Sequence, residues 1–210
     1  TMFCASPFHP IRRAALSLLL CVGLCAGVLP SAAQRAAGMA PVSAERSAAQ
    51  PDGAGAPITA AGWNVGLDDA DVGTIAARIA AFEGVDLWGL AEVNRASAVP
   101  DLEAAAEVGE AGDFKAVLGP SGGGMRLVAL YDDARFDLLE WFELTDINTT
   151  GNARAPLVLH LRDTVSGVQF LFMVNHLYRS RDDERHKQAQ MLNDWAEGRA
   201  LPVLAVGDYN

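Results

Sequence analysis

The sequence is poor in cysteine, in basic residues and in aromatic residues. Its three cysteines, Cys4, Cys21 and Cys25, all lie near the amino-terminus, so the rest of the chain can form no disulfide, no thiolate metal site and no cysteine nucleophile. Lysine and arginine number 16 against 26 aspartates and glutamates, which gives a net charge of −10 over 210 residues. This balance argues against a broad basic face, so a phosphate-bearing partner would have to bind at a local site, together with a metal cation.

Residues 1–33 have the pattern of an export signal. Arg12 and Arg13 precede an unbroken apolar run over residues 14–29, and Pro30 and several small residues follow it. A single membrane anchor is the alternative, but this run is shorter than the roughly 20 residues that a membrane-spanning helix needs. We therefore predict a cleaved signal peptide and a secreted or periplasmic protein.

Residues 34–57 consist mostly of Ala, Gly, Pro, Ser and scattered charges, without an aromatic residue, which is typical of a flexible linker. The folded domain is predicted to span residues 58–210. Without residues 1–33, which include two arginines and no acidic residue, 177 residues remain and the net charge is −12. A chain of this length can bury one substantial core.

Short apolar runs bounded by Gly, Pro, Asn and Asp alternate with segments of helical periodicity. Ser180, three residues before Asp183, predicts a capping box at the start of the third helix. A strand-rich core with flanking helices is typical of an α/β or α+β sandwich. The predicted strands span residues 58–65, 85–93, 114–118, 126–132, 136–144, 157–162, 168–177 and 203–208, and the predicted helices span residues 72–82, 100–110 and 183–197.

Four of the predicted strands run straight from apolar residues into a polar residue at the strand end: Asn64, Glu92, His176 and Asp208. An isolated carboxylate at the end of a buried strand costs several kcal/mol unless it is compensated, and two converging carboxylates repel each other. A divalent cation removes both penalties. Oxygen ligands such as Glu92 and Asp208, with an amide from Asn64 to orient them, suit magnesium, calcium or manganese better than zinc.

Four short motifs carry a family resemblance. Trp63-Asn64-Val65, Leu90-Ala91-Glu92-Val93, Val174-Asn175-His176-Leu177 and Gly207-Asp208-Tyr209-Asn210 resemble, in order, the motifs of the endonuclease/exonuclease/phosphatase superfamily. These metal-dependent phosphoesterases include deoxyribonucleases of the pancreatic type, inositol-polyphosphate phosphatases and bacterial sphingomyelinases. The resemblance covers residues 58–210, and it is specific because of the order, spacing and strand-end placement of the motifs.

The resemblance implies an α+β fold, a four-layer α/β/β/α sandwich of two packed mixed sheets with outer helices. It also implies metal-assisted attack of water on a phosphodiester or phosphomonoester. Glu92 would bind the metal, magnesium with manganese or calcium as alternatives, and Asn64 would support the metal and the nearby carboxylates. Asp208 would orient or activate the attacking water. Asn210 would donate a hydrogen bond to a phosphoryl oxygen, and His176 would contact the phosphate.

Each of these residues also has a purely structural interpretation. Asn64 could cap a turn, Glu92 could be a solvent-exposed strand end, and His176 could be a satisfied core histidine. Asp208 and Asn210 could form an Asx turn. These alternatives stay open at the level of the sequence.

A cluster of basic residues follows His176, and it could meet phosphates or form a solvated loop and helix start. In the second interpretation the acidic residues 182–184 balance it. Arg185 and Gln188, one helical turn apart, are expected to pin the third helix rather than touch substrate. The cluster consists of Arg179, Arg181, Arg185 and Lys187.

The superfamily continues beyond the Gly-Asp-x-Asn motif and ends in a Ser-Asp-His-type motif, which these 210 residues do not contain. We therefore expect a fold incomplete at the C-terminus, with residues 201–209 forming a strand whose neighbours are missing, and a polypeptide that alone is inactive and poorly folded. The expected function is an exported, nuclease-like phosphoesterase that depends on a divalent metal. The alternatives are a secreted phospholipid or sphingomyelin phosphodiesterase and a non-catalytic binding protein. The expected partner is a phosphate-ester substrate, a nucleic acid or a phospholipid headgroup, bound by a monomer without a membrane span.

Overall fold

The computed structural model describes residues 57–151 and 153–210. The predicted signal peptide, the three cysteines and nearly all of the predicted linker lie outside the described residues. Each predicted strand and helix of the domain is present in the described part, with ends that differ by a few residues from the predicted ones. None of the helices in this part is both long enough and apolar enough to cross a membrane.

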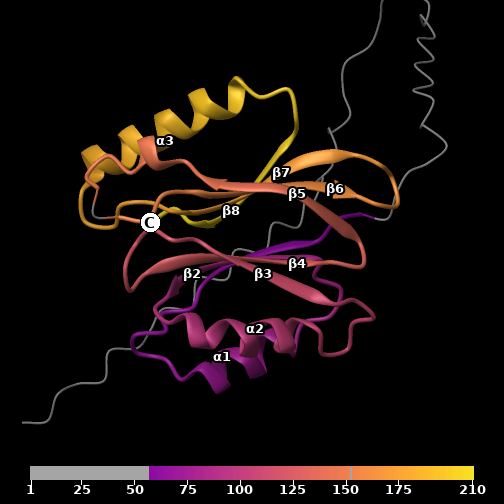
Figure 1. Cartoon of the computed structure of the whole chain (residues 1–210). Helices are drawn as coiled ribbons and strands as arrows, with labels where there is room; N and C mark the ends of the chain where they lie inside the picture. Colours follow the sequence, from indigo (N-terminus) through magenta and orange to yellow (C-terminus); the bar gives the residue numbers. More distant parts are fainter. Residues whose placement is uncertain (1–56, 152) are drawn as a thin grey trace, which may run out of the picture.

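Two four-stranded mixed sheets pack face to face (Figure 1). The first sheet has the order β1 (Ala60–Asn64), β2 (Leu87–Val93), β4 (Arg126–Asp132) and β3 (Phe114–Leu118). The second has the order β5 (Phe136–Glu143), β6 (Leu157–Asp163), β7 (Gln169–His176) and β8 (Val203–Asp208). Only the pairs β1 with β2 and β7 with β8 are parallel.

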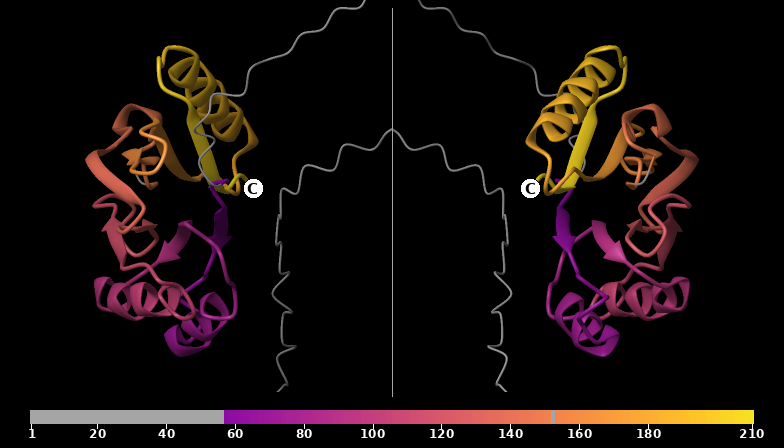
Figure 2. Two further views of the ribbon diagram at one scale, coloured as in Figure 1. Left: turned by 90° about the vertical axis from the view of Figure 1, so that its right-hand side faces the viewer. Right: turned by 90° about the vertical axis from the view of Figure 1, so that its left-hand side faces the viewer.

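Helices cover the outer face of each sheet. The first sheet is covered by α1 (Val72–Ile79) and α2 (Val99–Ala106), and the second by α3 (Asp182–Glu197) (Figures 1 and 2). Two short 3₁₀ helices, η1 (Ala96–Ala98) and η2 (Thr145–Ile147), lie in the connections. The predicted four-layer α/β/β/α sandwich is therefore confirmed.

Alternation of side chains along the strands divides the core into three layers. In β7, Phe172 and Val174 face the other sheet, whereas Leu171 and Met173 face α3. The inner strands are buried on both faces, and for this reason they read in the sequence as continuous apolar runs.

The helices begin with different stabilising contacts. Asp71 caps α1, because its carboxylate accepts a hydrogen bond from the Thr74 backbone N–H at 2.9 Å. The predicted capping box at Ser180 is wrong: α3 starts one residue after Arg181, which makes no side-chain cap hydrogen bond. Three acidic residues in the first turn of α3 take over this role, since negative charge is stabilised at a helix N-terminus.

Glycines allow the two sheets to approach closely where β1, β2 and β8 meet. A Cβ atom on Gly89 would lie 2.3 Å from Val206 Cγ2, and one on Gly62 would lie 2.7 Å from the Gly207 nitrogen. The contacts of Gly62 and Gly89 bring the carboxyl ends of strands from both sheets together. Within the second sheet, Gly207 pairs with Asn175, and a Cβ on Gly207, whose φ is 133°, would lie 2.0 Å from the Asn175 carbonyl oxygen.

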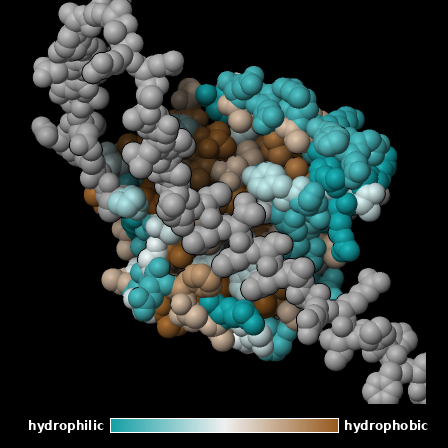
Figure 3. Space-filling model, turned by 180° about the vertical axis from the view of Figure 1, so that it is seen from behind, coloured by the Kyte–Doolittle hydropathy of each residue, from teal (hydrophilic) through white to brown (hydrophobic). Residues whose placement is uncertain are grey.

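The edge strands β1 and β8 lie on the same side of the sandwich (Figure 2). Viewed from the side on which β1 and β8 lie, the surface has hydrophobic patches between hydrophilic regions (Figure 3). No residue of β8 is fully buried. The expectation that this strand lacks its neighbours is wrong on one side, because β8 pairs with β7 from Leu171↔Val203 to His176↔Asp208.

Candidate active site

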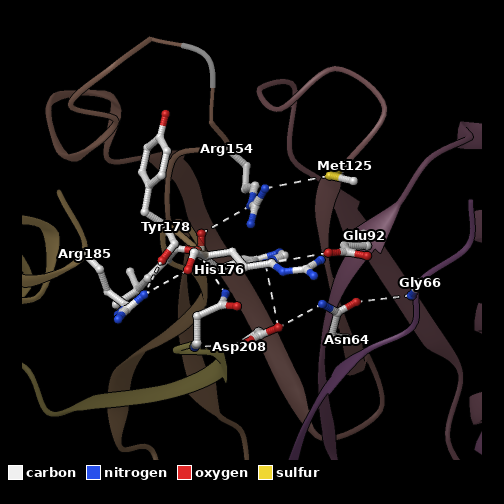
Figure 4. Close-up of polar contacts among 12 residues, drawn as sticks. Asn64, Gly66, Glu92, Met125, Arg154, His176, Tyr178, Arg185 and Asp208 are labelled. Carbon is white, nitrogen blue, oxygen red and sulfur yellow. Dashed lines mark hydrogen bonds and ion pairs between the residues drawn. The ribbon is translucent and has the colours of Figure 1, made fainter. Parts of the chain in front are cut away.

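The two parallel strand pairs bring the predicted residues to one end of the sandwich. Asn64 and Glu92 end the parallel strands of the first sheet, and His176 and Asp208 pair directly in the second. Packing of the sheets then joins the two pairs (Figure 4). The His176 Nε2 atom lies 3.7 Å from Glu92 Oε1 and 3.7 Å from Asp208 Oδ2. The imidazole is therefore in contact with a carboxylate from each sheet.

The side-chain amide of Asn64 makes two hydrogen bonds, one within a turn and one to the carboxylate of Asp208. Its Oδ1 atom accepts a hydrogen bond from the Gly66 N–H at 3.2 Å, which is the turn expected from a structural asparagine. Its Nδ2 atom donates to Asp208 Oδ2 at 2.8 Å across the sheet interface. The turn holds the amide plane, and the amide in turn orients the carboxylate of Asp208.

Glu92 has a backbone conformation that is rare for a residue with a side chain. Its φ is 63°, and the register between β2 and β4 shifts between Leu90 and Val93. A bulge of this kind turns a side chain out of the regular alternation of the strand, and such strain gathers at functional sites. In residues 57–151 and 153–210 nothing donates a hydrogen bond to the Glu92 carboxylate, whose side chain is 22% exposed.

His176 is buried and neutral at neutral pH. Burial, together with the positive charges of Arg154 and Arg179, lowers the pKa of its imidazole to about 4, while Asp208 acts in the opposite direction. Its carbonyl oxygen accepts a hydrogen bond from Arg154 Nε at 3.2 Å. Its Nδ1 atom is buried without a hydrogen-bond partner in the described part of the chain, so the ring retains unused hydrogen-bonding capacity.

Asp208 is held in its ionised form. Burial raises the pKa of its carboxyl, but hydrogen bonds from Asn64 and from the Asn210 backbone outweigh this effect, with the nearby His176 and Arg154 adding to them, and the pKa is lowered overall. The Asn210 N–H donates to Asp208 Oδ1 at 2.9 Å, which is the Asx turn anticipated as a structural alternative. A carboxylate that stays ionised and oriented can accept a proton from water.

Asn210 is placed less directly for its predicted role. Its Nδ2 atom donates to the Leu177 carbonyl oxygen at 3.1 Å, and its backbone has a φ of 53°. One amide proton is therefore engaged with the backbone and the second remains for a ligand. Contact between Asn210 and a phosphoryl oxygen stays a prediction.

A cavity of about 190 Å³ opens beside Glu92 and His176. Sequence reasoning did not single out Arg154, which contributes a partly buried guanidinium to this cavity. Burial lowers the pKa of Arg154, but an arginine remains charged at neutral pH. Its position directly before the buried run of β6 was the available signal, because a cation rarely adjoins such a run without a partner. The other lining residues are Met125, Ala153, Tyr178, Arg179 and Ser180.

The basic cluster after His176 divides between the two interpretations. Arg181 is paired with Asp183 and Glu184, and Arg185 with Asp182, so these two arginines belong to a solvated, charge-balanced helix start. Arg179, by contrast, lines the cavity.

Arg185 and Gln188 pin α3 as expected. Arg185 Nη1 donates to the carbonyl oxygens of Tyr178 and Arg179, each at 3.1 Å. The buried Gln188 accepts from the Tyr178 N–H at 2.9 Å and donates to the Ile147 carbonyl oxygen at 3.3 Å.

The residues present fit a partly hydrated metal ion rather than a full protein cage. In the described part of the chain no three His, Cys, Asp or Glu side chains are grouped to hold a metal ion. Magnesium, however, usually keeps several waters and binds only one or two carboxylates. Glu92, whose carboxylate accepts no hydrogen bond within the described part, fits such a ligand. Asn64 fits a supporting role, because its amide nitrogen is directed at Asp208.

Comparison of the sequence with protein-family models and with curated proteins gives no match. Comparison of the fold with solved structures gives clear similarity. A mannosyl-6-phosphatase of Bacteroides thetaiotaomicron is 21% identical with a TM-score of 0.57, over 73% of this chain and 66% of that one. An endonuclease/exonuclease/phosphatase family protein of the same organism is 18% identical with a TM-score of 0.57, over 73% and 63%. TDP2 of D. rerio, complexed with a single-stranded DNA product, is 24% identical with a TM-score of 0.60, over 73% and 60%.

The matched part of this chain thus spans 60 to 66% of the length of these three proteins. The chain has the fold of the endonuclease/exonuclease/phosphatase proteins, as the four sequence motifs indicated.

Proposed function

We propose that the protein is an exported phosphoesterase that depends on a divalent metal and hydrolyses phosphate esters by attack of water. One observation carries the proposal. Glu92 and Asp208, from different sheets, both lie 3.7 Å from His176 Nε2, and a cavity containing the Arg154 guanidinium opens beside them. Carboxylates for a cation and arginine for an anion at one place are the requirements of phosphoryl transfer.

Local charge favours an anionic substrate despite the acidic chain. Arg154 and Arg179 line the cavity together with Glu92, and the negative charges of Glu92 and Asp208 act on Arg154. Guanidinium groups bind phosphate oxygens through directed N–H donors, and partial burial strengthens such contacts. The anion would therefore bind at this one place, without a basic face.

Glu92 would hold the metal ion, magnesium in the first instance, and a bound ion supplies charge neutralisation at the phosphoryl oxygens. Asp208, ionised and oriented by Asn64, would accept a proton from the attacking water. The water oxygen forms a bond to phosphorus as the bond to the ester oxygen breaks, and the leaving oxygen takes a proton from solvent. His176, whose imidazole is neutral at neutral pH, would donate its N–H to a phosphoryl oxygen, and the guanidinium of Arg154 would bind the same phosphoryl group.

Nucleic acid is the first candidate substrate. The similar TDP2 structure contains a single-stranded DNA product, which supports a nuclease-like activity. Export rests on the pattern of residues 1–33, and it is tested by locating the protein in the medium or periplasm after expression with this segment intact.

The test measures hydrolysis by the full-length protein that contains these 210 residues. Substrates are a single-stranded DNA oligonucleotide, a sugar phosphate and bis(p-nitrophenyl) phosphate, with magnesium and with chelator. Glu92→Gln is expected to reduce kcat/KM roughly 100-fold or more, because it removes the charge that holds the metal. Glu83→Gln, an exposed acid beside α1, is the matched control and should retain activity.

Magnesium binding by calorimetry gives a second readout on the same variants. Weaker binding in Glu92→Gln, with unchanged binding in the control, supports the role of Glu92 as the ligand. Equal metal affinity in both variants, or turnover that persists in chelator, would overturn the proposal.

A further inference from the structure

We propose that the cavity beside His176 is a preformed subsite for phosphate esters that bear a ring, with the ring of the substituent packed against Tyr178. The inference rests on the proposed function and deepens it, because it names the class of substrate. The cavity shares Glu92 and His176 with the candidate active site and extends from them to Met125, Ala153 and Tyr178. The lining thus combines charged side chains with the apolar surfaces of Met125, Ala153 and Tyr178.

Tyr178 is fixed at both ends of its side chain. At the backbone, its N–H donates to Gln188 Oε1 at 2.9 Å, and its carbonyl oxygen accepts from Arg185 Nη1 at 3.1 Å. At the far end of the ring, its hydroxyl is hydrogen-bonded to the hydroxyl of Thr150. A ring held in this way loses little conformational freedom when a ligand packs on it, which makes it an effective binding wall.

Arg154 is fixed next to this ring, and Figure 4 shows the two side chains standing beside each other. Arg154 Nε donates a hydrogen bond to the His176 carbonyl oxygen, and Nη1 lies 3.9 Å from Met125 Sδ. Within the described part of the chain the Nη2 atom has no hydrogen-bond partner. The guanidinium group of Arg154 thus has N–H donors available for a phosphate, and the ring of Tyr178 lies next to it.

The volume limits what the substituent can be. At about 190 Å³ the cavity is smaller than the roughly 300–1,000 Å³ of sites for drug-sized ligands, so it suits one ring joined to a phosphate. Bases stack on aromatic side chains whatever their sequence, and the apolar face of a sugar ring packs on them in a similar way. Nucleotides and sugar phosphates share this chemistry, whereas an acyclic phosphate ester has no face to offer Tyr178.

The test compares two substitutions of Tyr178 in the full-length protein. Tyr178→Phe keeps the ring and loses the hydroxyl, and Tyr178→Leu loses the ring. Trp141→Leu, an exposed aromatic residue of β5, is the matched control. Steady-state kinetics are measured with a thymidine dinucleotide, with a hexose phosphate and with glycerol phosphate, which has no ring.

Tyr178→Leu is expected to raise KM about tenfold for a ring-bearing substrate, with less than a twofold change for glycerol phosphate. Tyr178→Phe should keep most of the affinity. A larger effect on the dinucleotide assigns the subsite to nucleotides, and a larger effect on the hexose phosphate assigns it to sugars. Equal changes for all three substrates, or no change, would overturn the inference.

Equilibrium binding separates this inference from the proposed function. Thymidine monophosphate and inorganic phosphate are titrated into the protein by calorimetry, which needs no turnover. Tighter binding of the nucleotide that is lost in Tyr178→Leu supports the subsite even if nothing is hydrolysed. Equal affinity for the nucleotide and for phosphate contradicts it, whatever the activity.

Discussion

Acidification between pH 6.5 and pH 4 is expected to destabilise the protein through His176. Burial lowers the pKa of this imidazole from 6.5 to about 4 in the folded state. In the unfolded chain the same group takes up a proton below its ordinary pKa of 6.5. The unfolded state therefore binds more protons in this interval, and the free energy of unfolding falls as the pH falls.

The size of the effect follows from the shift. One pKa unit corresponds to about 1.4 kcal/mol, so a shift from 6.5 to about 4 corresponds to roughly 3 kcal/mol, all of it lost by about pH 4 and fully present above pH 7. The side chain of His176 is only 2% exposed, so solvent screening reduces this little. The lowered pKa of Asp208 contributes stability that is lost only below its ordinary value of 3.8.

The assay is urea unfolding followed by circular dichroism between pH 4.5 and pH 8, with chelator present so that metal binding does not contribute. The useful quantity is the difference between the wild-type protein and His176→Gln, since the substitution removes the titrating group and leaves other titrations in place. His160→Gln, which alters a histidine hydrogen-bonded to Gln169, is the matched control and is measured at the same pH values. If wild type and His176→Gln lose the same free energy of unfolding between pH 7 and pH 4.5, the reasoning is refuted.

Substitutions at two further positions test contacts that hold the domain together. Gly207→Ala is expected to lower the free energy of unfolding in urea by roughly 2–4 kcal/mol, because its Cβ would lie 2.0 Å from the Asn175 carbonyl oxygen at a φ of 133°. The control Gly109→Ala, with a φ of 82° and open space around the new Cβ, should lower it by about 1 kcal/mol. Similar losses in the two variants would contradict the close approach of β7 and β8. Glu143→Leu is expected to lower the free energy of unfolding by roughly 2 kcal/mol, because Glu143 Oε1 accepts hydrogen bonds from the backbone N–H and the hydroxyl of Ser121 at 3.1 and 2.9 Å. Glu143→Gln keeps an acceptor and should lower it by less than half as much. Equal losses in the two variants would show that these hydrogen bonds contribute little to stability.

The strands and helices of the domain were predictable because their signals are local. Continuous apolar runs such as that of β7 mark strands buried on both faces, and the spacing of Ile75 and Ile79 marks the buried side of α1. The capping box at Ser180 failed because a helix N-terminus has several equivalent solutions. In α3 three acidic residues in the first turn interact favourably with the helix dipole, and no side chain caps the helix.

The contacts of the site were less predictable, since they depend on packing between the sheets. The motifs identified Asn64 and Asp208, but their hydrogen bond joins residues 144 positions apart. Arg154 belongs to no motif that we recognised, and it meets His176 only because β6 and β7 are neighbours in one sheet. Similarly, the structural and functional interpretations of Asn64 were posed as alternatives, although one amide both closes the turn with Gly66 and donates a hydrogen bond to Asp208.

The sequence by itself determined the order of the elements and the polar residues at the strand ends, because periodicity and strand termination are properties of short segments. The layers of the sandwich were implied by the family resemblance of the four motifs. Only the tertiary structure decided which of these residues meet. The bulge that turns Glu92, the glycine contact that brings β8 against the first sheet and the cavity between Arg154 and Tyr178 arise from how two sheets pack. Packing depends on the shape of the whole interior, and no local stretch of sequence contains that information.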